Sequence, residues 1–483
     1  MASAEKSLDT LETVLDMDAT SLASAIKQEK ISSYEAISTY IDHSKHVNPS
    51  INATVEDRYE TALSEAREMD NRREQTDKGP LHGVPISIKE AFDVAGMKTT
   101  GGIKSRKHLI ARNDAEIVSK LKKAGAIILG KTNIPMLCFC QETDNKLYGR
   151  TNNPWDLTRT AGGSSGGEGA LLGTGGAAAG IGSDIGGSIR FPSHFNGVVG
   201  FKPGKFQVSP VGHFPLNAHP LQDRMAGMGP MGKSVRDIEL MYQVIATNPV
   251  EKQSIYDCKV DIVPAVTGFP LSANSTNILH EIANVLRRSL SVNRIIPPYF
   301  EESAQLWQEI MSIDGGKMMK KLAFNHDRPN VVRGYVQEMM TKNTEIHQYM
   351  SWALIGAKLF KPTTGKLREI AAMIKQGDKT LSDYLKNRML ILPVYHTSAP
   401  EHGNVYREIF SIRKSFLQFM PYVAYANVWG LPSLTVPVDT DDDRMPIGVQ
   451  ILSRNGNEDM IFQLGKILEE HFRGYVRCSQ LDS

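Results

Sequence analysis

The densest run of glycine and serine in the chain lies between residues 162 and 202, and it limits what the chain can fold into. The run begins with GGSSGGEG at 162–169 and, after many small residues, reaches GSDIGGSIRFP at 182–192. Glycine allows positive φ and lets another group approach the backbone closely, and serine adds a compact hydroxyl. Together they suit a site where backbone N–H groups converge on a developing negative charge.

A run of this composition is also typical of a flexible linker. Here it is interrupted by apolar residues that favour burial, and it carries fixed charges at Glu168, Asp184 and Arg190. We therefore expect a folded site rather than a linker. Residues 173–178 loosely fit the phosphate-binding pattern G-x-G-x-x-A, but no clear strand precedes them, so this match is weak.

Two short apolar runs upstream predict buried strands. Residues 84–88 lie between proline and glycine signals and predict one strand, with Lys89 at its end. Asp114 can cap a helix that Gly125 ends, and residues 126–129 predict a second strand. Because strands and helices alternate in this way, the sequence predicts an α/β fold with a mixed or parallel sheet.

Residues 250–395 lack the glycine-rich character and are helical in pattern, with many methionine and aromatic side chains. Methionine commonly fills irregular gaps in a core, so core packing is the simplest interpretation. The functional interpretation is a plastic apolar wall for a substrate. We expect residues 1–483 to form a single domain in which 250–395 is a helical insertion that covers the core.

The bulk composition excludes several classes of partner. A formal net charge of +2 over 483 residues does not indicate binding to nucleic acid or to an anionic membrane, which would favour a strongly basic protein. No apolar run reaches the length of about 18 residues that a membrane span needs, and the polar N-terminus has no apolar segment typical of a signal peptide. The four cysteines fit neither a disulfide framework nor a zinc site. We expect reduced thiols, a cytoplasmic location, and no metal or cofactor.

Several separated motifs resemble the amidase signature hydrolases. The matching segments are residues 82–90 (HGVPISIKE), 130–133 (GKTN), 149–155 (GRTNNPW), 162–203, 430–437 (GLPSLTVP) and 446–450 (PIGVQ). They occur in the order of the family and cover most of the chain, and they are most similar to the fatty-acid-amide-hydrolase-like branch and its bacterial amidase relatives. The resemblance implies a large mixed, twisted β-sheet sandwiched between helices.

The resemblance also implies the roles of three side chains. Ser188 matches the nucleophile that becomes acylated, Ser164 matches the serine that bridges to it, and Lys89 matches the general base and acid. A lysine can take this role near neutral pH where burial favours its neutral amine; the alternative for Lys89 is a surface pair with Glu90. Because the peptide bond before the bridging serine is cis in relatives, we predict a cis Gly163–Ser164 bond.

Other residues of the same motifs have supporting roles in the family pattern. The implied oxyanion donors are the backbone N–H groups of Ile185, Gly186, Gly187 and Ser188. We expect Ser165, Asp184 and Arg190 to orient the site rather than to take part in the chemistry. Cys138 falls where relatives often place a pocket-lining residue, so Cys138 and Gly163 are expected to line the substrate site. No family role maps onto a histidine, and we expect the histidines to be structural.

Two other catalytic patterns also fit the sequence. Residues 125–132 (GAIILGKT) fit the P-loop, in which Lys131 would bind nucleotide, but a P-loop must open a helix and these residues are strand-like. Residues 162–166 fit the nucleophile elbow G-x-S-x-G, which needs a strand before it and a helix after it. The preceding residues 152–156 predict a loop, so the elbow is the weaker interpretation.

The sequence therefore predicts an amidase that hydrolyses linear or aryl amides with an apolar acyl group through a seryl acyl-enzyme. Carbamates (urethanes) and esters share this acyl-transfer chemistry and stay open on the same residues. The amidase subunit of a tRNA-dependent amidotransferase is a further alternative, and it would need partner subunits. From other classes, an ATPase that uses Lys131 and a non-catalytic binding protein are retained as hypotheses. The expected partner is a small amide or carbamate, and the sequence is compatible with a homodimer.

Overall fold

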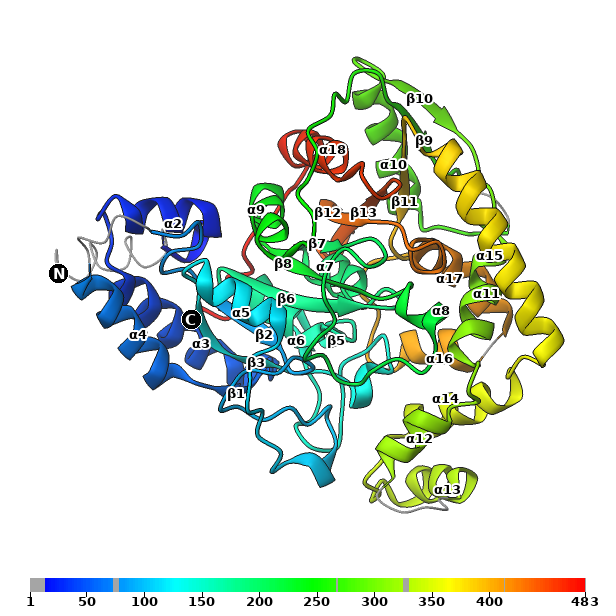
Figure 1. The fold of residues 1–483 in the computed structure, drawn as a ribbon, viewed down its shortest axis with the longest axis horizontal. Helices are drawn as coiled ribbons and strands as arrows, with labels where there is room; N and C mark the ends of the chain where they lie inside the picture. Colours follow the sequence, from blue (N-terminus) through cyan, green and yellow to red (C-terminus); the bar gives the residue numbers. More distant parts are fainter. Residues whose placement is uncertain (1–13, 73–77, 266–267, 325–329, 412, 483) are drawn as a thin grey trace.

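The computed structural model of the chain describes residues 14–72, 78–265, 268–324, 330–411 and 413–482. Figure 1 shows a central sheet with helices on both sides of it. The sequence expectation about a signal peptide concerns the first residues, which lie outside the described part of the chain. Within the described part, no helix combines the length and the apolar character needed to cross a membrane.

Eleven strands in the described residues form one mixed sheet. In spatial order they are β1 (Thr54–Asp57), β3 (Ile127–Thr132), β2 (Pro85–Lys89), β6 (Ala179–Asp184), β8 (Gly227–Gly232), β7 (Val199–Lys202), β12 (Ser433–Thr440), β13 (Pro446–Leu452), β11 (Arg388–Pro393), β9 (Lys259–Ile262) and β10 (Ser291–Arg294). Strands β3, β2 and β6 run parallel, as do β11, β9 and β10, and the other neighbours are antiparallel. The predicted α/β class with a large mixed sheet is confirmed. A separate hairpin consists of β4 (Asn152–Asn153) and β5 (Asp156–Thr160).

Helices cover both faces of this sheet (Figure 1). One face packs against α5 (Glu116–Lys123), α9 (Val235–Ile245) and α18 (Glu458–His471), and the other against α6 (Gly166–Gly173) and α7 (Arg190–Asn196). The remaining helices are α2 (Ala19–Lys27), α3 (Ser33–Ile51), α4 (Tyr59–Asn71), α8 (Pro220–Asp223), α10 (Ala273–Leu286), α11 (Glu302–Met311), α12 (Lys317–Ala323), α13 (Val331–Thr341), α14 (Gln348–Leu359), α15 (Thr364–Tyr384), α16 (Asn404–Ser411) and α17 (Arg413–Val428), with 3₁₀ turns η1 (Lys104–Arg106) and η2 (Met136–Cys138).

The alternation of side chains along β2 decides which face of the sheet carries the polar groups. Ile86 and Ile88 are fully buried in the larger apolar core. Because successive side chains of a strand point to opposite faces, Ser87 and Lys89 point the other way, toward the segment that begins α6. The two strands predicted from the apolar runs are thus present as β2 and β3. The predicted cap of the helix between them is wrong, since Asp114 instead accepts hydrogen bonds from Ala95 N and Lys122 Nζ.

Residues 250–395 contain the predicted helices, but they also supply β9, β10 and β11 at one end of the central sheet. The helical pattern of this segment thus predicted its helices and missed its three strands. Strands β9 (KVDI) and β10 (SVNR) are short and mix charged with apolar residues, so they lack the apolar run that predicted the central strands. In Figure 1, α12, α13 and α14 lie together at one corner of the molecule, beyond the sheet.

Candidate active site

Lys89 is the last residue of strand β2 and has no solvent exposure. The sequence predicted it at the end of this strand. Its Nζ donates hydrogen bonds to Ser164 Oγ at 2.7 Å and to the carbonyl oxygen of Ser183 at 3.1 Å. Burial lowers the pKa of Lys89, because a charged ammonium loses its hydration there. The alternative of a surface pair with Glu90 is excluded, since the Glu90 carboxylate accepts hydrogen bonds from two backbone amides of the following turn.

Ser164 lies two residues before the start of α6, and the Gly163–Ser164 peptide bond is cis, as predicted. Gly163 packs directly against the backbone of residues 140–142: a Cβ at this position would lie 2.7 Å from the carbonyl oxygen of Cys140. Real Cβ atoms do not approach a backbone oxygen so closely, so the position holds glycine for lack of space. This packing brings the 138–142 segment beside the candidate relay.

Ser188 lies on the loop between β6 and α7 and is almost fully buried. The backbone N–H of Ser165 donates to the carbonyl oxygen of Ser188 at 3.1 Å, which joins the two serine-bearing segments. Ser165 Oγ also reaches the carbonyl oxygen of Ser183, at 3.4 Å. Within the described residues, the hydroxyls of Ser164 and Ser188 are not hydrogen bonded to each other. The structure therefore contains the Lys89–Ser164 link of the predicted relay and not the Ser164–Ser188 link.

A buried ion pair shapes the Ser188 loop. The Asp184 carboxylate accepts hydrogen bonds from the N–H groups of Gly187 at 2.8 Å and Ile189 at 3.1 Å, and from Arg190 Nε at 3.0 Å. Burial alone would raise the pKa of Asp184, but the Arg190 guanidinium overcomes this effect and holds the pKa well below its usual range. Asn427 donates a further hydrogen bond to the same carboxylate at 2.9 Å. These contacts are what a residue that orients the loop would make.

The four predicted oxyanion donors differ in whether their N–H groups already have a hydrogen-bond acceptor. The N–H of Gly187 already donates to Asp184. The N–H groups of Ile185, Gly186 and Ser188 have no hydrogen-bond acceptor in the described part of the chain. Three of the four donors are therefore free to bind an oxyanion, and the fourth holds the loop in shape.

Two side chains from outside the loop contact its carbonyl groups, and no sequence motif assigns either of them to the site. Trp307 Nε1 on α11 donates to the carbonyl oxygen of Ile185 at 2.8 Å. Gln141 Nε2 reaches the carbonyl oxygen of Gly186 at 3.4 Å. A Cβ on Gly186 would lie 2.7 Å from the Trp307 ring, so only glycine allows the ring to close over the loop.

Glu168 is in the first turn of α6, near enough to Lys89 for their charges to interact, and is fully buried. Its carboxyl accepts hydrogen bonds from Ser87 Oγ at 2.5 Å and Thr132 Oγ1 at 2.8 Å. Burial raises the pKa of Glu168 to about 7, although both hydroxyls and the nearby Lys89 oppose the effect. Glu168 belongs to the glycine-rich run, but its charge alone does not indicate a role. No pattern in the sequence could have shown that it lies beside Lys89, because the contact depends on how α6 packs against β2 and β3.

His213 is the histidine near this cluster, and its contacts are structural. Its Nε2 is 2.9 Å from Ser183 Oγ, and its Nδ1 is 3.2 Å from the carbonyl oxygen of Pro215. Burial, followed by the charge of Lys89, lowers the pKa of His213 to about 3, so the ring is neutral near pH 7. No hydrogen bond joins it to either candidate serine in the described residues, so it is not placed to act as their base.

Cys138 ends the turn η2 and is half-buried, at positive φ. Burial raises the pKa of its thiol, while neighbouring Lys89 and Ser164 lower it. The structure thus places Cys138 beside the candidate relay. No cluster of three or more metal-ligating side chains occurs within the ranges that the structure describes.

An apolar hollow of about 250 Å³ adjoins the oxyanion loop on its Trp307 side. Phe139, Trp307, Met311, Trp352 and Phe416 are among its lining residues. The methionine and aromatic side chains of 250–395 therefore divide between two interpretations. Some line this hollow, whereas others, such as the fully buried Met350, pack into the core.

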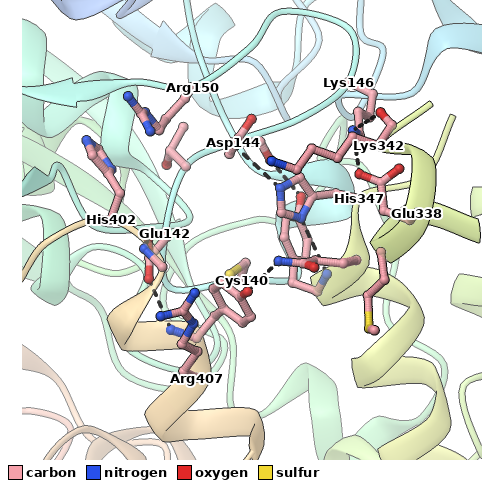
Figure 2. Close-up of a pocket in the computed structure, with 16 residues that line it drawn as sticks. Cys140, Glu142, Asp144, Lys146, Arg150, Glu338, Lys342, His347, His402 and Arg407 are labelled. Carbon is pink, nitrogen blue, oxygen red and sulfur yellow. Dashed lines mark hydrogen bonds and ion pairs between the residues drawn. The ribbon is translucent and has the colours of Figure 1, made fainter. Parts of the chain in front are cut away.

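A second hollow, of about 410 Å³, lies on the other side of the 140–143 segment and is polar (Figure 2). Figure 2 shows Lys146 paired with Glu338, and these two groups approach to 2.5 Å. His347 faces Asp144 at 3.6 Å across the same space. The sequence-predicted site residues do not line this hollow, so its size alone does not make it the active site.

The residues of the two competing motifs have different roles in the structure. Lys131 belongs to β3, and its Nζ donates to Thr99 Oγ1 at 3.0 Å and to the carbonyl oxygen of Lys98. The strand continues through the P-loop match instead of opening a helix, so the nucleotide-binding hypothesis is wrong. Ser164 is followed by α6, but the strand before it, β5, belongs to a separate hairpin and not to the central sheet that an elbow requires.

Comparison with known proteins gives a consistent result. A family model described as Amidase matches residues 35–462. The chain is 32% identical over 487 residues to fatty-acid amide hydrolase 2-B of Danio rerio. The aligned region covers 96% of this chain and 91% of that protein. The chain is 39% identical over 484 residues to a glutamyl-tRNA(Gln) amidotransferase subunit of Carboxydothermus hydrogenoformans, covering 94% and 97%. A solved structure of 6-aminohexanoate cyclic dimer hydrolase is similar with a TM-score of 0.80 at 26% identity, covering 97% of this chain and 100% of that one.

Proposed function

The chain belongs to the amidase signature family, and from this premise we propose that it hydrolyses linear or aryl amides with an apolar acyl group through Ser188, Ser164 and Lys89. The observation that carries the proposal is the 2.7 Å contact between the fully buried Lys89 Nζ and Ser164 Oγ, next to the loop that bears Ser188. A serine hydroxyl is a weak nucleophile without a base, and a buried lysine with a lowered pKa supplies one.

In the proposed acylation step, neutral Lys89 takes the proton of Ser164, and Ser164 takes the proton of Ser188. Ser188 Oγ then forms a bond to the amide carbonyl carbon. The carbonyl oxygen becomes an oxyanion, and the free N–H groups of Ile185, Gly186 and Ser188 are its donors. This step requires the Ser188 hydroxyl to turn toward Ser164, because the two are not hydrogen bonded in the structure.

The carbon–nitrogen bond then breaks, and its nitrogen leaves with a proton that returns from Lys89 through Ser164. An amine is a poor leaving group, so this proton delivery matters as much as the attack. In the second half of the reaction, a water molecule gives a proton to Ser164 and its oxygen attacks the acyl carbon. Ser188 leaves with the returned proton, and the products are a carboxylic acid and the amine.

The apolar hollow beside Trp307 supports the choice of an apolar acyl group. Trp307 contacts both the hollow and the carbonyl of Ile185, so an acyl chain in the hollow would begin next to the oxyanion loop. We propose that α11 and α14 of the 250–395 segment form the wall of this acyl site. The name of the similar fatty-acid amide hydrolase 2-B agrees with such a substrate. Carbamates and esters of the same shape would use the same groups.

A second candidate function is the amidase subunit of a tRNA-dependent amidotransferase. The 39% identity to a glutamyl-tRNA(Gln) amidotransferase subunit favours it. A protein of that kind works together with partner chains, whereas the proposed amidase acts alone on a small amide. Affinity purification from the source cell distinguishes them: stoichiometric partner chains and no amide hydrolysis by the isolated chain would favour the amidotransferase.

The proposal is tested by hydrolysis of a short aliphatic amide, an anilide, a long-chain fatty amide and an ethyl carbamate. Wild type is expected to cleave at least one of them, and Ser188→Ala and Lys89→Ala to lose about a thousandfold or more of that rate. Ser193→Ala is the matched control, because Ser193 is buried like Ser188 but lies on α7, and its hydroxyl has no partner among the described residues. Full activity in Ser188→Ala would disprove the assignment of the nucleophile.

A further inference from the structure

The side chain of Gln141 carries a buried hydrogen-bond acceptor with no partner. Gln141 is only 5% exposed, and its Nε2 donates to the carbonyl oxygen of Gly186. Its Oε1 has no hydrogen-bond partner among the described residues. The Gly186 carbonyl can only accept a hydrogen bond, so the NH₂ group of Gln141 faces it, at 3.4 Å, and Oε1 lies on the other side of the amide. Since buried polar atoms are normally paired, the free oxygen points to a donor that the protein itself does not supply.

The position of Gln141 suggests where that donor comes from. The segment that bears it starts at Cys138, beside Lys89 and Ser164, and reaches the oxyanion loop at Gly186. A Cβ on Gly163 would lie 2.8 Å from the backbone carbonyl carbon of Gln141, so this segment packs on the residue before Ser164. A scissile amide whose carbonyl enters the oxyanion loop and whose nitrogen receives a proton from Ser164 has to stand next to this segment.

The neighbours of Gln141 face elsewhere. Cys140 and Glu142 line the polar hollow of Figure 2, and Gln141 is not one of the residues that line it. The contact of Gln141 Nε2 with the carbonyl oxygen of Gly186 places its side chain beside the oxyanion loop instead.

We propose that Gln141 is a specificity-determining residue whose Oε1 accepts a hydrogen bond from the N–H of the scissile amide. This inference rests on the proposed function of the Ser188 site. The substrate class is then primary and secondary amides, including anilides that keep their N–H. Esters and tertiary amides have no such donor and leave Oε1 buried and unpaired. A site that is built to hydrogen-bond a substrate N–H discriminates strongly against analogues that lack it.

The test uses three substrates with the same acyl and aryl groups: hexanoyl p-nitroanilide, its N-methyl derivative and p-nitrophenyl hexanoate. Gln141→Met removes the acceptor and keeps the length of the side chain. Its kcat/KM on the anilide is expected to fall about tenfold to a hundredfold. Gln141→Met also removes the Nε2 contact with the Gly186 carbonyl, and that loss acts on all three substrates alike. The fall in kcat/KM on the N-methyl anilide and the ester should therefore be clearly smaller than on the anilide, which alone also loses a hydrogen bond to the substrate. Gln305→Met, at an exposed glutamine of α11, is the matched control and should leave all three rates unchanged.

The ester also reports whether the variant is folded, because Ser188 would cleave it in the same site. Equal losses on all three substrates would overturn the inference, and so would a wild type that cleaves the N-methyl anilide as fast as the anilide. The second comparison needs no variant and stands if Gln141→Met does not fold. Failure of the proposed function looks different: wild type would cleave none of the three, or Ser188→Ala would cleave them at the wild-type rate.

Discussion

The amine nitrogen of Lys89 lies 2.7 Å from Ser164 Oγ, at a position with no solvent exposure. The two residues come from different elements, since Lys89 ends β2, the third strand from one edge of the sheet, and Ser164 precedes α6 on one face of it. The strand and helix that hold them are themselves buried. The fold thus removes water from the lysine and keeps a hydroxyl against it, which are the two conditions for a lysine base.

The first prediction concerns the pH dependence of hydrolysis. Burial lowers the pKa of Lys89 below the ordinary 10.5, and only the neutral amine can accept a proton. The value of kcat/KM should therefore rise with pH and level off below the ordinary lysine range, with no loss on the alkaline side up to about pH 9. A stopped assay from about pH 5 to 10 measures the profile. Lys89→Arg should be inactive at every pH, because a guanidinium stays charged. A profile without an inflection, or an active Lys89→Arg, would contradict the role of the base.

The second prediction concerns Glu168 and stability. Burial raises the pKa of this carboxyl from 4.5 to about 7, so the folded state holds a proton that the unfolded state has lost. The contribution of this carboxyl to the free energy of unfolding is fully present below about pH 4.5 and is lost as the pH rises toward 7. The loss is on the order of 3 kcal/mol. The Glu168→Gln variant should show no such loss, because glutamine does not titrate.

Urea unfolding of wild type and Glu168→Gln at several pH values between 4.5 and 7.5 measures the difference. As the pH rises, the free energy of unfolding of wild type should fall relative to that of Glu168→Gln. The exposed Glu345→Gln serves as the control and should follow wild type throughout. Parallel curves for Glu168→Gln and wild type would mean that the buried carboxyl is ionised over this whole range.

The central part of the fold could be predicted from the sequence because its signals are local. Strands β2 and β3 are apolar runs between glycine and proline breaks, and the helix between them has the 3.6-residue period. Strands β9 and β10 could not be found in this way, because a strand such as Ser291–Arg294 is largely exposed and has no apolar run. Its partner in the sheet, and not its own sequence, makes it a strand.

The residues of the candidate site also differ in whether the sequence alone could identify them. Ser188, Ser164 and Lys89 were named from motifs, since a family pattern assigns residues by position in the sequence. Gln141 and Trp307 carry no motif, and they reach the oxyanion loop only because distant segments pack there. Contacts of this kind depend on tertiary packing, which neither propensity nor periodicity encodes.

The third prediction tests the buried ion pair of the Ser188 loop. Asp184→Asn leaves the Arg190 guanidinium buried without a counter-charge, which should lower the free energy of unfolding by about 3–5 kcal/mol. Asp443→Asn is the matched control, because Asp443 is 67% exposed and pairs with Arg159 at the surface. It should cost less than about 1 kcal/mol. Urea unfolding near pH 7 measures both, and similar small losses would mean that Arg190 is held by its neutral partners alone.

The fourth prediction tests whether the apolar hollow binds the acyl chain. Gly356 lies on α14 and lines the hollow, and a Cβ there would meet no atom within 4 Å. Gly356→Leu should therefore fill the hollow without a clash, and it replaces a poor helix former with a good one. Displacing two or three methylene groups of a bound chain should lower kcat/KM on a long-chain amide about tenfold to a hundredfold. A short aliphatic amide should be cleaved at nearly the wild-type rate.

Gly334→Leu separates this effect from a general response to a leucine on a helix surface. Gly334 lies on α13, also has no atom within 4 Å of a Cβ, and does not line the hollow. It should leave both substrates unaffected. If Gly356→Leu lowers the rates on both chain lengths equally, the leucine disturbs the Trp307 side of the oxyanion loop instead of an acyl site. If it lowers neither, the acyl chain binds elsewhere and the hollow is a packing defect among α11, α14 and α17.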